Sequence, residues 1–370
     1  MTTPDPRRPL SVVLAGGGSA GHVSPMLALA DALVRRDPTT RVLALGTEEG
    51  LELRLVPARG YRLVTIPKVP LPRRPSGALL KVPFRLRRAI DIAAEAIASV
   101  DADVVVGMGG YVSPPAYLAA RRLRVPIVVH EQNTRPGVAN RLGARLTRHV
   151  AVTFAGTRLA NAVRVGMPLR REISTLDRGS VRNAARAVLG LDPDAPTLLV
   201  TGGSLGAQRL NDAVSGAADD LAAAGIGVLH LTGAGKSGAG RPAGAAGPAR
   251  IVLEYCDRMD LAYAAADLVL CRAGANTVCE LTSVGLPAVY VPLPIGNGEQ
   301  RLNAEPVVAA GGGLLVDDHD LDADWLADHV VPLLGDPVRL AAMATAAAST
   351  GMPDADERLA DLVERAAGRS

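Results

Sequence analysis

Two glycine-rich turns constrain the fold of this chain more than any other feature of its sequence. The first, AGGGSAGHVSP (residues 15–25), and the second, TGGSLGAQ (residues 201–208), each follow a short apolar run. A glycine turn between a strand and a helix leaves backbone N–H groups at the positive end of the helix dipole, where phosphate oxygens bind. One such turn could equally serve close packing alone, but two in equivalent places predict two phosphate-binding α/β halves.

Short runs of β-branched residues alternate with helical patterns along the chain, as parallel sheets require. The expected strands are residues 11–14, 41–45, 104–106, 127–129, 150–153, 197–200, 228–231, 268–270 and 288–291. Ser24 is expected to cap a helix over residues 26–36 with Pro25 at its first position, and a helix after Asn276 is expected to end at Gly285. The fold class is therefore α/β, with two Rossmann-like doubly wound domains facing each other across a cleft.

The second glycine turn and the polar stretch before it place a domain boundary near residues 165–168. We expect an N-terminal domain over residues 1–167, a C-terminal domain over 168–350, and a C-terminal helix in 351–370 that packs back on the first domain. The stretch from Arg170 to Arg186 is interpreted as a polar connection, and the low-complexity stretch 233–250 as a mobile loop.

The overall composition excludes several classes of protein. The net charge of +3 is small for 370 residues, and six tyrosines, two phenylalanines and one tryptophan offer few stacking platforms, so nucleic acid is not an expected partner. Cys256, Cys271 and Cys279 lack C-x-x-C spacing and are expected to be reduced, buried thiols. No apolar run reaches the roughly 18 residues of a spanning helix, so the chain is expected to be neither exported nor transmembrane.

Three motifs resemble known sites, and each fails on a specific feature. A nicotinamide dinucleotide enzyme carries an acidic residue at the end of its second strand, but Glu48 comes only after that strand. The Gly-Lys-Ser at 235–237 ends like a Walker loop, but His230 stands where the first glycine belongs. Asp101 and Asp103 form an Asp-x-Asp triplet of the kind that holds a metal. They precede a strand and so lie at the edge away from the ligand, and we interpret them as a solvated turn.

A better candidate for binding a ribose lies in CRAGANTVCE (residues 271–280). Here a strand turns through Gly274 into a helix, and Glu280 falls about one turn inside it. An ionised carboxylate only accepts hydrogen bonds, so it can hold both hydroxyls of a ribose at once. The alternative is an ordinary solvated glutamate on a helix. The stretch VPLPIGNGEQRLNA (residues 291–304) follows at the same expected edge of the sheet.

Seven motifs in this order resemble those of the MurG family of UDP-N-acetylglucosamine transferases. They are GGGSAGHVSP, GMGGYVSPP, HEQN, VGMPLR, GGSLGAQRLN, CRAGANTVCE and EQRLNA, and they extend over nearly the whole chain. The resemblance implies a GT-B fold, with the acceptor and the membrane on the N-terminal domain and UDP-GlcNAc on the C-terminal domain. It implies an inverting transfer of GlcNAc from UDP-GlcNAc to the MurNAc 4-hydroxyl of lipid I, the undecaprenyl diphosphate-linked MurNAc-pentapeptide. The product would be lipid II for peptidoglycan.

The resemblance also implies a set of site residues, with no cofactor and no metal. Contacts with the sugar nucleotide are expected from Ser19, Ala20, Gly21, Asn133, Arg170, Ser204, Cys256, Ala275, Asn276, Thr277, Glu280 and Gln300. Contacts with the acceptor are expected from Gly18, Gly109, Gly110, Tyr111 and Asn211. Two positions depart from the family: Ala20 replaces a frequent glycine, and Glu299 stands where relatives often have a second glutamine.

The chemistry of these residues agrees with glycosyl transfer. His22 suits a general base near pH 7, because the helix dipole at its position disfavours the imidazolium form. Glu131, at the end of a strand, is a second candidate for orienting or deprotonating the acceptor. Arg170, Ser204 and the second helix N-terminus suit stabilisation of the departing diphosphate. Four histidines are expected to be structural or exposed, namely His149, His230, His319 and His329.

Residues 68–88 combine basic and apolar side chains without an acidic one. Such a segment can place apolar groups at the acyl boundary while its cations meet anionic headgroups. We therefore expect a peripheral location on the cytoplasmic side of the cell membrane, with an anionic surface bound through Lys81, Phe84, Arg85, Arg87 and Arg88. The alternative is a solvated basic loop.

Three other functions stay open on the sequence alone. They are a soluble GT-B transferase acting on a small natural product, a nicotinamide-dependent oxidoreductase, and a non-catalytic sensor of nucleotide sugars. The first gives no reason for the basic apolar segment, and the second lacks the acidic residue after its second strand. The third has no need of His22.

Overall fold

The computed structural model describes residues 8–69, 82–203, 206–236, 240, 247–295 and 297–369. Its contacts divide the chain into two compact units, one made of Met1–Arg170 with Asp354–Ser370 and the other of Arg171–Pro353. We expected the first boundary after residue 167, and the contacts place it after Arg170. The last segment of the chain belongs to the first unit, whose order in sequence is therefore interrupted by the whole of the second.

The first unit contains a parallel sheet of seven strands in the described residues, in the order β3-β2-β1-β4-β5-β6-β7. The strands are β1 (Ser11–Ala15), β2 (Arg41–Thr47), β3 (Arg62–Ile66), β4 (Val104–Gly107), β5 (Ile127–Glu131), β6 (His149–Val152) and β7 (Ala162–Arg164). The central strands carry unbroken apolar runs because helices cover both faces of the sheet. The expected strands of this half are present, and β3 and β7 are additional to them.

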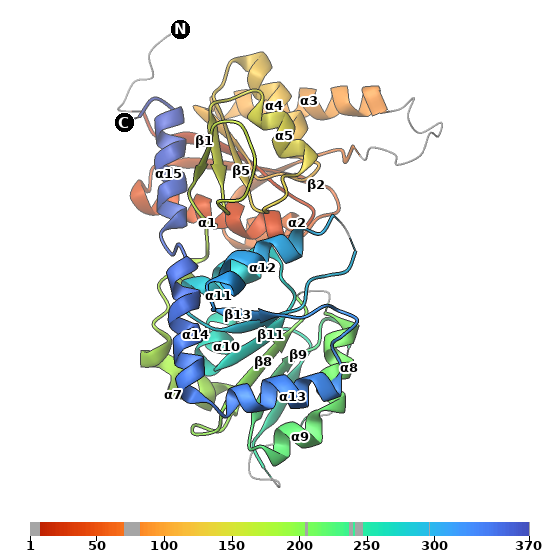
Figure 1. The fold of residues 1–370 in the computed structure, drawn as a ribbon. Coiled ribbons are helices and arrows are strands. Elements are labelled where there is room, and N and C mark those ends of the chain that lie inside the picture. The colour runs from red at the N-terminus through yellow and green to blue at the C-terminus, as the bar shows by residue number, and fades with distance from the viewer. Residues whose placement is uncertain are drawn as a thin grey trace. The chain divides into compact units, whose positions relative to one another are not determined.

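Helices cover both faces of this sheet, and each face has its own buried cluster. They are α1 (Ala20–Arg36), α2 (Glu52–Ala58), α3 (Val82–Ser99), α4 (Ser113–Leu123), α5 (Val138–Ala144) and α15 (Ala355–Ala366). Leu29 of α1 and Leu359 of α15 share one buried cluster with Val12, while Ile97 of α3 shares the opposite cluster with Val13. Figure 1 shows α15, coloured blue, beside the elements of this unit, where it packs against α1.

The second unit repeats this plan with a parallel sheet of six strands, again counted over described residues, in the order β10-β9-β8-β11-β12-β13. The strands are β8 (Thr197–Thr201), β9 (Gly227–Leu231), β10 (Arg250–Leu253), β11 (Leu268–Cys271), β12 (Ala288–Tyr290) and β13 (Gly313–Leu315). Its helices are α6 (Arg171–Ser174), α7 (Arg178–Leu189), α8 (Gln208–Gly216), α9 (Ala218–Ala223), α10 (Met259–Ala265), α11 (Ala275–Ser283), α12 (Glu299–Ala309), α13 (Ala323–Leu334) and α14 (Pro337–Thr350). The expected doubly wound α/β class is confirmed for both halves.

Helix α1 begins earlier than the sequence predicted. Its N-cap is Ser19 rather than Ser24, and Pro25 lies inside the helix. Proline lacks the N–H that would reach the carbonyl of Gly21, so the helix continues through Pro25 with one hydrogen bond fewer. The early start places His22 in the first turn of α1, directly after the glycine loop.

The expected polar connection between Arg170 and Arg186 is wrong, because most of it is the amphipathic helix α7. Asp177 caps this helix by accepting hydrogen bonds from the amides of Gly179 (3.1 Å) and Ser180 (3.4 Å). One face of α7 carries an arginine every fourth residue, at Arg178, Arg182 and Arg186. This face packs against α10 and pairs with Asp267, the residue directly before β11.

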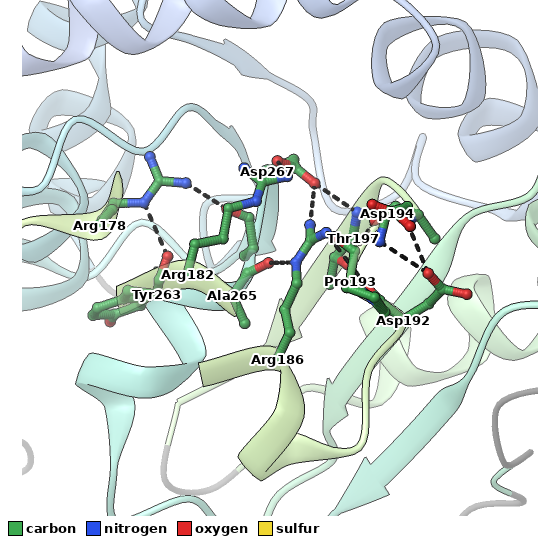
Figure 2. Close-up of polar contacts among 12 residues, drawn as sticks. Arg178, Arg182, Arg186, Asp192, Pro193, Asp194, Thr197, Tyr263, Ala265 and Asp267 are labelled. Carbon is green, nitrogen blue, oxygen red and sulfur yellow. Dashed lines mark hydrogen bonds and ion pairs between the residues drawn. The ribbon is translucent and has the colours of Figure 1, made fainter. Parts of the chain in front are cut away.

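The partners of these arginines explain how so much charge is tolerated inside the unit (Figure 2). The side chain of Arg186 is 1% exposed, and its Nη2 lies 2.8 Å from Asp267 Oδ2 while its Nε donates to the carbonyl of Ala265 at 3.0 Å. Arg182 Nη2 lies 2.6 Å from Asp267 Oδ1, and Asp267 Oδ2 also accepts from the amide of Thr197 at 2.8 Å. Because every charge meets an opposite charge or a carbonyl, the cluster satisfies the condition for burying ions.

The Asp-x-Asp triplet is solvated only in part. Asp101 is exposed as expected, but the side chain of Asp103 is only 4% exposed. Its carboxylate accepts from the amide of Ser11 at 2.9 Å and from Arg369 Nη2 at 3.2 Å, and it pairs with Arg8. The triplet lies where β1 and β4 begin, so Asp103 joins the two ends of the chain to the sheet at that edge.

In the part of the chain that the structure describes, no single helix is long and apolar enough to cross a membrane, and one bent pair, Ala323–Leu334 with Pro337–Ala366, passes on length and composition alone.

Replacing Asp267 by asparagine should lower the free energy of unfolding of the second unit by about 3 kcal/mol, since Arg186 would remain buried without its counter-charge. The single tryptophan, Trp325, lies in α13 of this unit, so urea unfolding followed by its fluorescence measures the change. The control is Asp219→Asn, an exposed aspartate on α9 of the same unit, for which we expect a change within about 0.5 kcal/mol. Equal stability of the two variants would contradict the role assigned to Asp267.

Candidate functional site

The order of strands locates the ligand-binding edge of each unit. The chain reverses direction across the sheet between β1 and β4 in the first unit and between β8 and β11 in the second. In open parallel sheets ligands bind beyond the carboxyl ends of the strands at this switch point. The candidate edges are therefore the loops after β1 and β4 in one unit, and the loops after β8 and β11 in the other.

The loops after β1 and β4 meet around His22. Gly109 and Gly110 both have left-handed backbone conformations, with φ of 99° and 74°. A Cβ atom on Gly109 would lie 3.0 Å from His22 Nε2, and one on Gly110 would lie 2.8 Å from the carbonyl oxygen of Gly17. Glycine is therefore required at both positions, and it lets the imidazole lie against the second loop.

His22 is half-buried in the first turn of α1, with Nδ1 3.0 Å from the Ser19 hydroxyl. Burial lowers the pKa of this imidazole, and the negative charge of Glu52 opposes that effect only in part. The ring is thus neutral near pH 7, as the sequence predicted. Burial is its main cause, where the sequence analysis had invoked the helix dipole.

Glu52 is a residue of this edge that the sequence analysis missed. Its side chain is fully buried at the start of α2, and its carboxylate accepts from the Thr47 amide at 2.8 Å, the Thr47 hydroxyl at 2.7 Å and the Gly18 amide at 3.0 Å. Burial raises its pKa, but these hydrogen bonds outweigh that effect and hold the pKa below its ordinary value. Gly18, which we expected to contact the acceptor, therefore donates its amide hydrogen to the buried carboxylate of Glu52.

Glu131 at the end of β5 likewise accepts hydrogen bonds from the backbone of a neighbouring loop. It is 2% exposed and accepts from the amides of Asn133 and Gly137, each at 2.9 Å, and from Asn140 Nδ2 at 3.0 Å. Burial raises its pKa. These bonds fix the loop that carries Asn133, an expected donor contact, so Glu131 shapes this loop.

His130, next to Glu131, is fully buried and forms a separate pair of contacts. Its Nε2 lies 2.8 Å from the carbonyl of Gly166, and its Nδ1 lies 3.0 Å from Gln132 Nε2. Burial lowers its pKa to about 4, so it is neutral at physiological pH. The ring connects β5 to the segment that follows β7.

At the second edge, Glu280 is half-buried on α11 and accepts a hydrogen bond from the hydroxyl of Tyr263 at 2.7 Å. Ala275, Asn276 and Thr277 form the first turn of the same helix, as expected for residues beyond the carboxyl end of β11. Glu280 and this helix N-terminus are thus brought together on one element, where the amide dipoles favour a negatively charged ligand.

The neighbouring loop after β12 is held by three side chains, Arg272, Glu299 and Gln300. Arg272 Nη1 donates to the carbonyl of Val291 at 3.2 Å and lies 2.5 Å from Asp318 Oδ1. Gln300 Oε1 accepts from the amide of Leu293 at 2.9 Å, and Glu299 Oε2 accepts from the amide of Asn297 at 3.3 Å. Both Glu299 and Gln300 therefore shape this loop through contacts with its backbone.

The remaining expected residues are distributed as follows. Ser19 and Tyr111 are exposed, Ala20, Gly21, Arg170 and Cys256 are half-buried, and Ser204 lies outside the described residues. Lys68 Nζ lies 5.4 Å from the centre of the Tyr111 ring. Burial raises the pKa of the Cys256 thiol, so this cysteine is not an activated nucleophile.

Asn211, expected to contact the acceptor, is buried and both ends of its amide are used within the second unit. Its Nδ2 donates to the carbonyl of Thr232 at 3.1 Å, and its Oδ1 lies 2.9 Å from His230 Nε2. Burial lowers the pKa of His230 to about 4, so the histidine is neutral and structural, as expected. These bonds join α8 to β9, which is a packing role that the sequence did not indicate for Asn211.

The expected membrane-binding residues lie at the start of α3, except Lys81, which lies outside the described residues. Phe84 is 78% exposed, and Arg85, Arg87 and Arg88 are exposed beside it. The buried face of α3 begins only at Ala89. Figure 1 shows this first part of the helix extending beyond the sheet of its own unit.

Within the described residues, no group of three or more histidine, cysteine, aspartate or glutamate side chains is arranged to hold a metal ion.

Two family models match the chain, the glycosyltransferase family 28 N-terminal domain over residues 12–152 and the glycosyltransferase family 28 C-terminal domain over residues 197–359. A relative from Nocardioides sp. is 60% identical over 96% of this chain and 97% of its own length. It is named UDP-N-acetylglucosamine--N-acetylmuramyl-(pentapeptide) pyrophosphoryl-undecaprenol N-acetylglucosamine transferase. A relative of the same name from Streptomyces coelicolor is 58% identical over 96% of this chain and 98% of its own.

Solved structures show the same likeness. MurG of Acinetobacter baumannii is 30% identical with a TM-score of 0.77, covering 96% of this chain and 100% of that one. The glycosyltransferase of kitacinnamycin is 20% identical with a TM-score of 0.66, covering 97% and 99%, and shows the fold alone. The two doubly wound units are thus those of a glycosyltransferase of the GT-B fold. The chain belongs to glycosyltransferase family 28 and, within it, to the MurG family.

Replacing Glu52 by glutamine should lower the free energy of unfolding of the first unit by about 2 kcal/mol, because an amide NH₂ would face the donors of Thr47 and Gly18. The pKa of Glu52 is lowered in the folded state, so its stabilisation is present above the ordinary glutamate pKa and is lost as the pH falls through the folded value. Calorimetric unfolding at pH 7 and at lower pH measures both effects. The matched control is Glu49→Gln, whose side chain is 77% exposed. Indistinguishable transitions for the two variants would refute the assignment.

Proposed function

We infer that this chain transfers GlcNAc from UDP-GlcNAc to the MurNAc 4-hydroxyl of lipid I with inversion of the anomeric centre, giving lipid II for peptidoglycan synthesis. The observation that carries this inference is the 60% identity, over 96% of the chain, to a relative named for that reaction. Natural-product glycosyltransferases, such as that of calicheamicin at 21% identity, share only the fold. The hypothesis of a soluble transferase for small natural products is therefore less well supported than transfer to lipid I.

We propose that the second unit binds UDP-GlcNAc at the edge formed after β8 and β11. Glu280 would accept hydrogen bonds from the ribose hydroxyls, and the first turn of α11 would face the nucleotide. Gln300, Cys256 and the turn that contains Ser204 would complete the donor contacts. The position of Glu280 one turn inside α11, beyond the carboxyl end of β11, supports this assignment.

We propose that the first unit binds lipid I around His22, with the imidazole as the general base that takes the proton of the attacking hydroxyl. The neutral ring, lying against Gly109 at the switch point, supports this role. Of the two candidate bases, Glu131 is the weaker, because three hydrogen bonds from the following loop and α5 engage its carboxylate. As the hydroxyl attacks the anomeric carbon, the bond to UDP breaks and the diphosphate carries away the electron pair. Donors such as Arg170 would stabilise that charge.

We propose that the start of α3 attaches the enzyme to the cytoplasmic face of the cell membrane. Exposed Phe84 suits the acyl boundary, and Arg85, Arg87 and Arg88 suit anionic headgroups, at about 1 kcal/mol for each cation near the surface. Because the acceptor carries an undecaprenyl chain, a membrane-facing segment on the acceptor unit fits the reaction.

Incubation with UDP-GlcNAc and a lipid I analogue should release UDP and form the disaccharide product, and His22→Ala should lower kcat by roughly 10²–10⁴-fold with little change in UDP affinity. Burial lowers the pKa of His22, so kcat/KM of the parent should stay level down to the ordinary histidine value of about 6.5 and fall only below it. The control is His149→Ala, a half-buried histidine at the amino end of β6. Parental kcat in the folded His22 variant would remove this residue from the mechanism.

Reversing the charge of Arg85, Arg87 and Arg88 to glutamate should abolish sedimentation with vesicles containing anionic lipid, while turnover of a short-chain acceptor is retained. The reason is that each exposed cation loses its attraction to the headgroups and gains repulsion. Vesicle co-sedimentation at physiological ionic strength measures the effect.

The matched control reverses three exposed arginines elsewhere on the same unit, Arg41, Arg54 and Arg62. This variant has the same change of net charge and should still bind vesicles. If both triple variants sediment alike, α3 is not the anchor.

A further inference from the structure

The expected diol ligand, Glu280, is held by a side chain from the neighbouring helix. Tyr263 on α10 is 2% exposed, and its hydroxyl donates to Glu280 Oε2 at 2.7 Å. We propose that Tyr263 is a positioning residue for the nucleotide: it fixes the Glu280 carboxylate in the orientation that accepts the ribose hydroxyls of UDP. The proposal rests on the donor site assigned to Glu280 above.

The backbone that carries Tyr263 is itself fixed by Arg178 of α7 (Figure 2). Arg178 Nε donates to the carbonyl of Tyr263 at 3.0 Å, and Nη1 donates to the carbonyl of Gly285 at 3.0 Å. Gly285 follows directly on the C-cap of α11, so one guanidinium joins the ends of the two helices that carry Tyr263 and Glu280. The third nitrogen donates to the carbonyl of Ala266, next to the end of α10.

The electrostatics of this clamp are favourable. A cation at the C-terminal end of a helix meets the negative end of the dipole, and Arg178 stands at two such ends. Burial lowers its pKa to about 10, so the group stays charged at pH 7. Arg186 adds a bond to the carbonyl of Ala265, the last residue of α10. Helix α10 is thereby fixed to α7, and Tyr263 with it.

The hydroxyl of Tyr263 contributes to binding by ordering Glu280 before the nucleotide arrives. A glutamate side chain loses rotamer freedom when it binds a ligand, and a preformed hydrogen bond removes part of that cost. A carboxylate offers about four acceptor positions, so a bond from Tyr263 is compatible with bonds from the ribose hydroxyls. Hydrogen bonds to an ionised group are the stronger kind, which suits this one for holding a side chain in place.

The second unit supplies a matched control in Tyr290 of β12. This tyrosine is also fully buried, but its hydroxyl has no hydrogen-bond partner among the described residues. Tyr290→Phe and Tyr263→Phe therefore remove the same atom from equally buried rings, and only the second removes a bond to Glu280.

The test measures the dissociation constants of UDP and of 2′-deoxy-UDP by calorimetry on the full chain. Tyr263→Phe should weaken UDP binding by up to about 10-fold, the cost of ordering a rotamer-rich side chain such as Glu280 on binding. Binding of 2′-deoxy-UDP should weaken less, because one of the ribose hydroxyls is already absent, so the preference for UDP over 2′-deoxy-UDP should shrink. Tyr290→Phe should change neither constant. In the Glu280→Ala background, Tyr263→Phe should have no further effect, since the two residues act as one unit.

Failure of this proposal differs from failure of the donor site. If Glu280→Ala weakens UDP binding but Tyr263→Phe keeps the parental preference for UDP, the positioning role is wrong and the donor site stands. If Glu280→Ala leaves UDP affinity unchanged, the donor site itself is wrong and the positioning role falls with it. Should Tyr263→Phe fail to fold, Arg178→Lys replaces it, because lysine keeps the charge but loses the three-pronged contact. A reduced preference for UDP in that variant supports the proposal, and an unchanged one overturns it.

Discussion

Burying a carboxylate is unfavourable unless hydrogen-bond donors surround it, and this constraint organises the ligand edge of the first unit. Glu52 is fully buried and accepts hydrogen bonds from the amides of Thr47 and Gly18, so the glycine loop after β1 is fixed to a buried carboxylate. Glu131 gathers the amides of Asn133 and Gly137 in the same way after β5. Loops made of small residues thereby acquire one defined shape beside His22.

The second unit applies the same constraint with the signs reversed. Here arginines are buried, and carbonyls at helix ends provide most of their partners, with Asp267 supplying the negative charge. The consequence reaches the ligand edge, because the helices fixed in this way carry Tyr263 and Glu280. Catalytic geometry depends on such supporting contacts, since small displacements of a binding group cost much of its effect.

The sequence was most informative where the signal is local. Central parallel strands are buried on both faces and read as unbroken apolar runs, and all the expected strands are present. Four strands were missed. Strands β7 and β13 have only three residues each, β3 has apolar residues among polar ones at the sheet edge, and the four-residue β10 begins at the end of the low-complexity stretch. The predicted start of helix α1 was too late, because proline usually stands in the first turn of a helix and Pro25 lies further inside this one.

The long-range contacts could not be read from the sequence. Arginines are rarely buried, so α7 was interpreted as a polar connection; its partner Asp267 comes 81 residues after Arg186. The role of Glu52 was also invisible in the sequence. Its hydrogen-bond donors come together only when β1 and β2 pair. The family motifs identified the candidate site residues, but they did not distinguish Asn211, which packs α8 on β9, from residues that can face a ligand.

The position of α15 determines the order in which the two units can fold during synthesis on the ribosome. The core of the first unit includes Leu359 and Val363, which are synthesised only after the whole of the second unit. At roughly 5–20 residues per second, the apolar face of α1 waits tens of seconds for the helix that covers it. The second unit, whose residues are all contiguous, can complete its core first. The nascent chain therefore exposes an incomplete first unit until α15 has been synthesised, and the uncovered apolar surface is prone to aggregation in that interval.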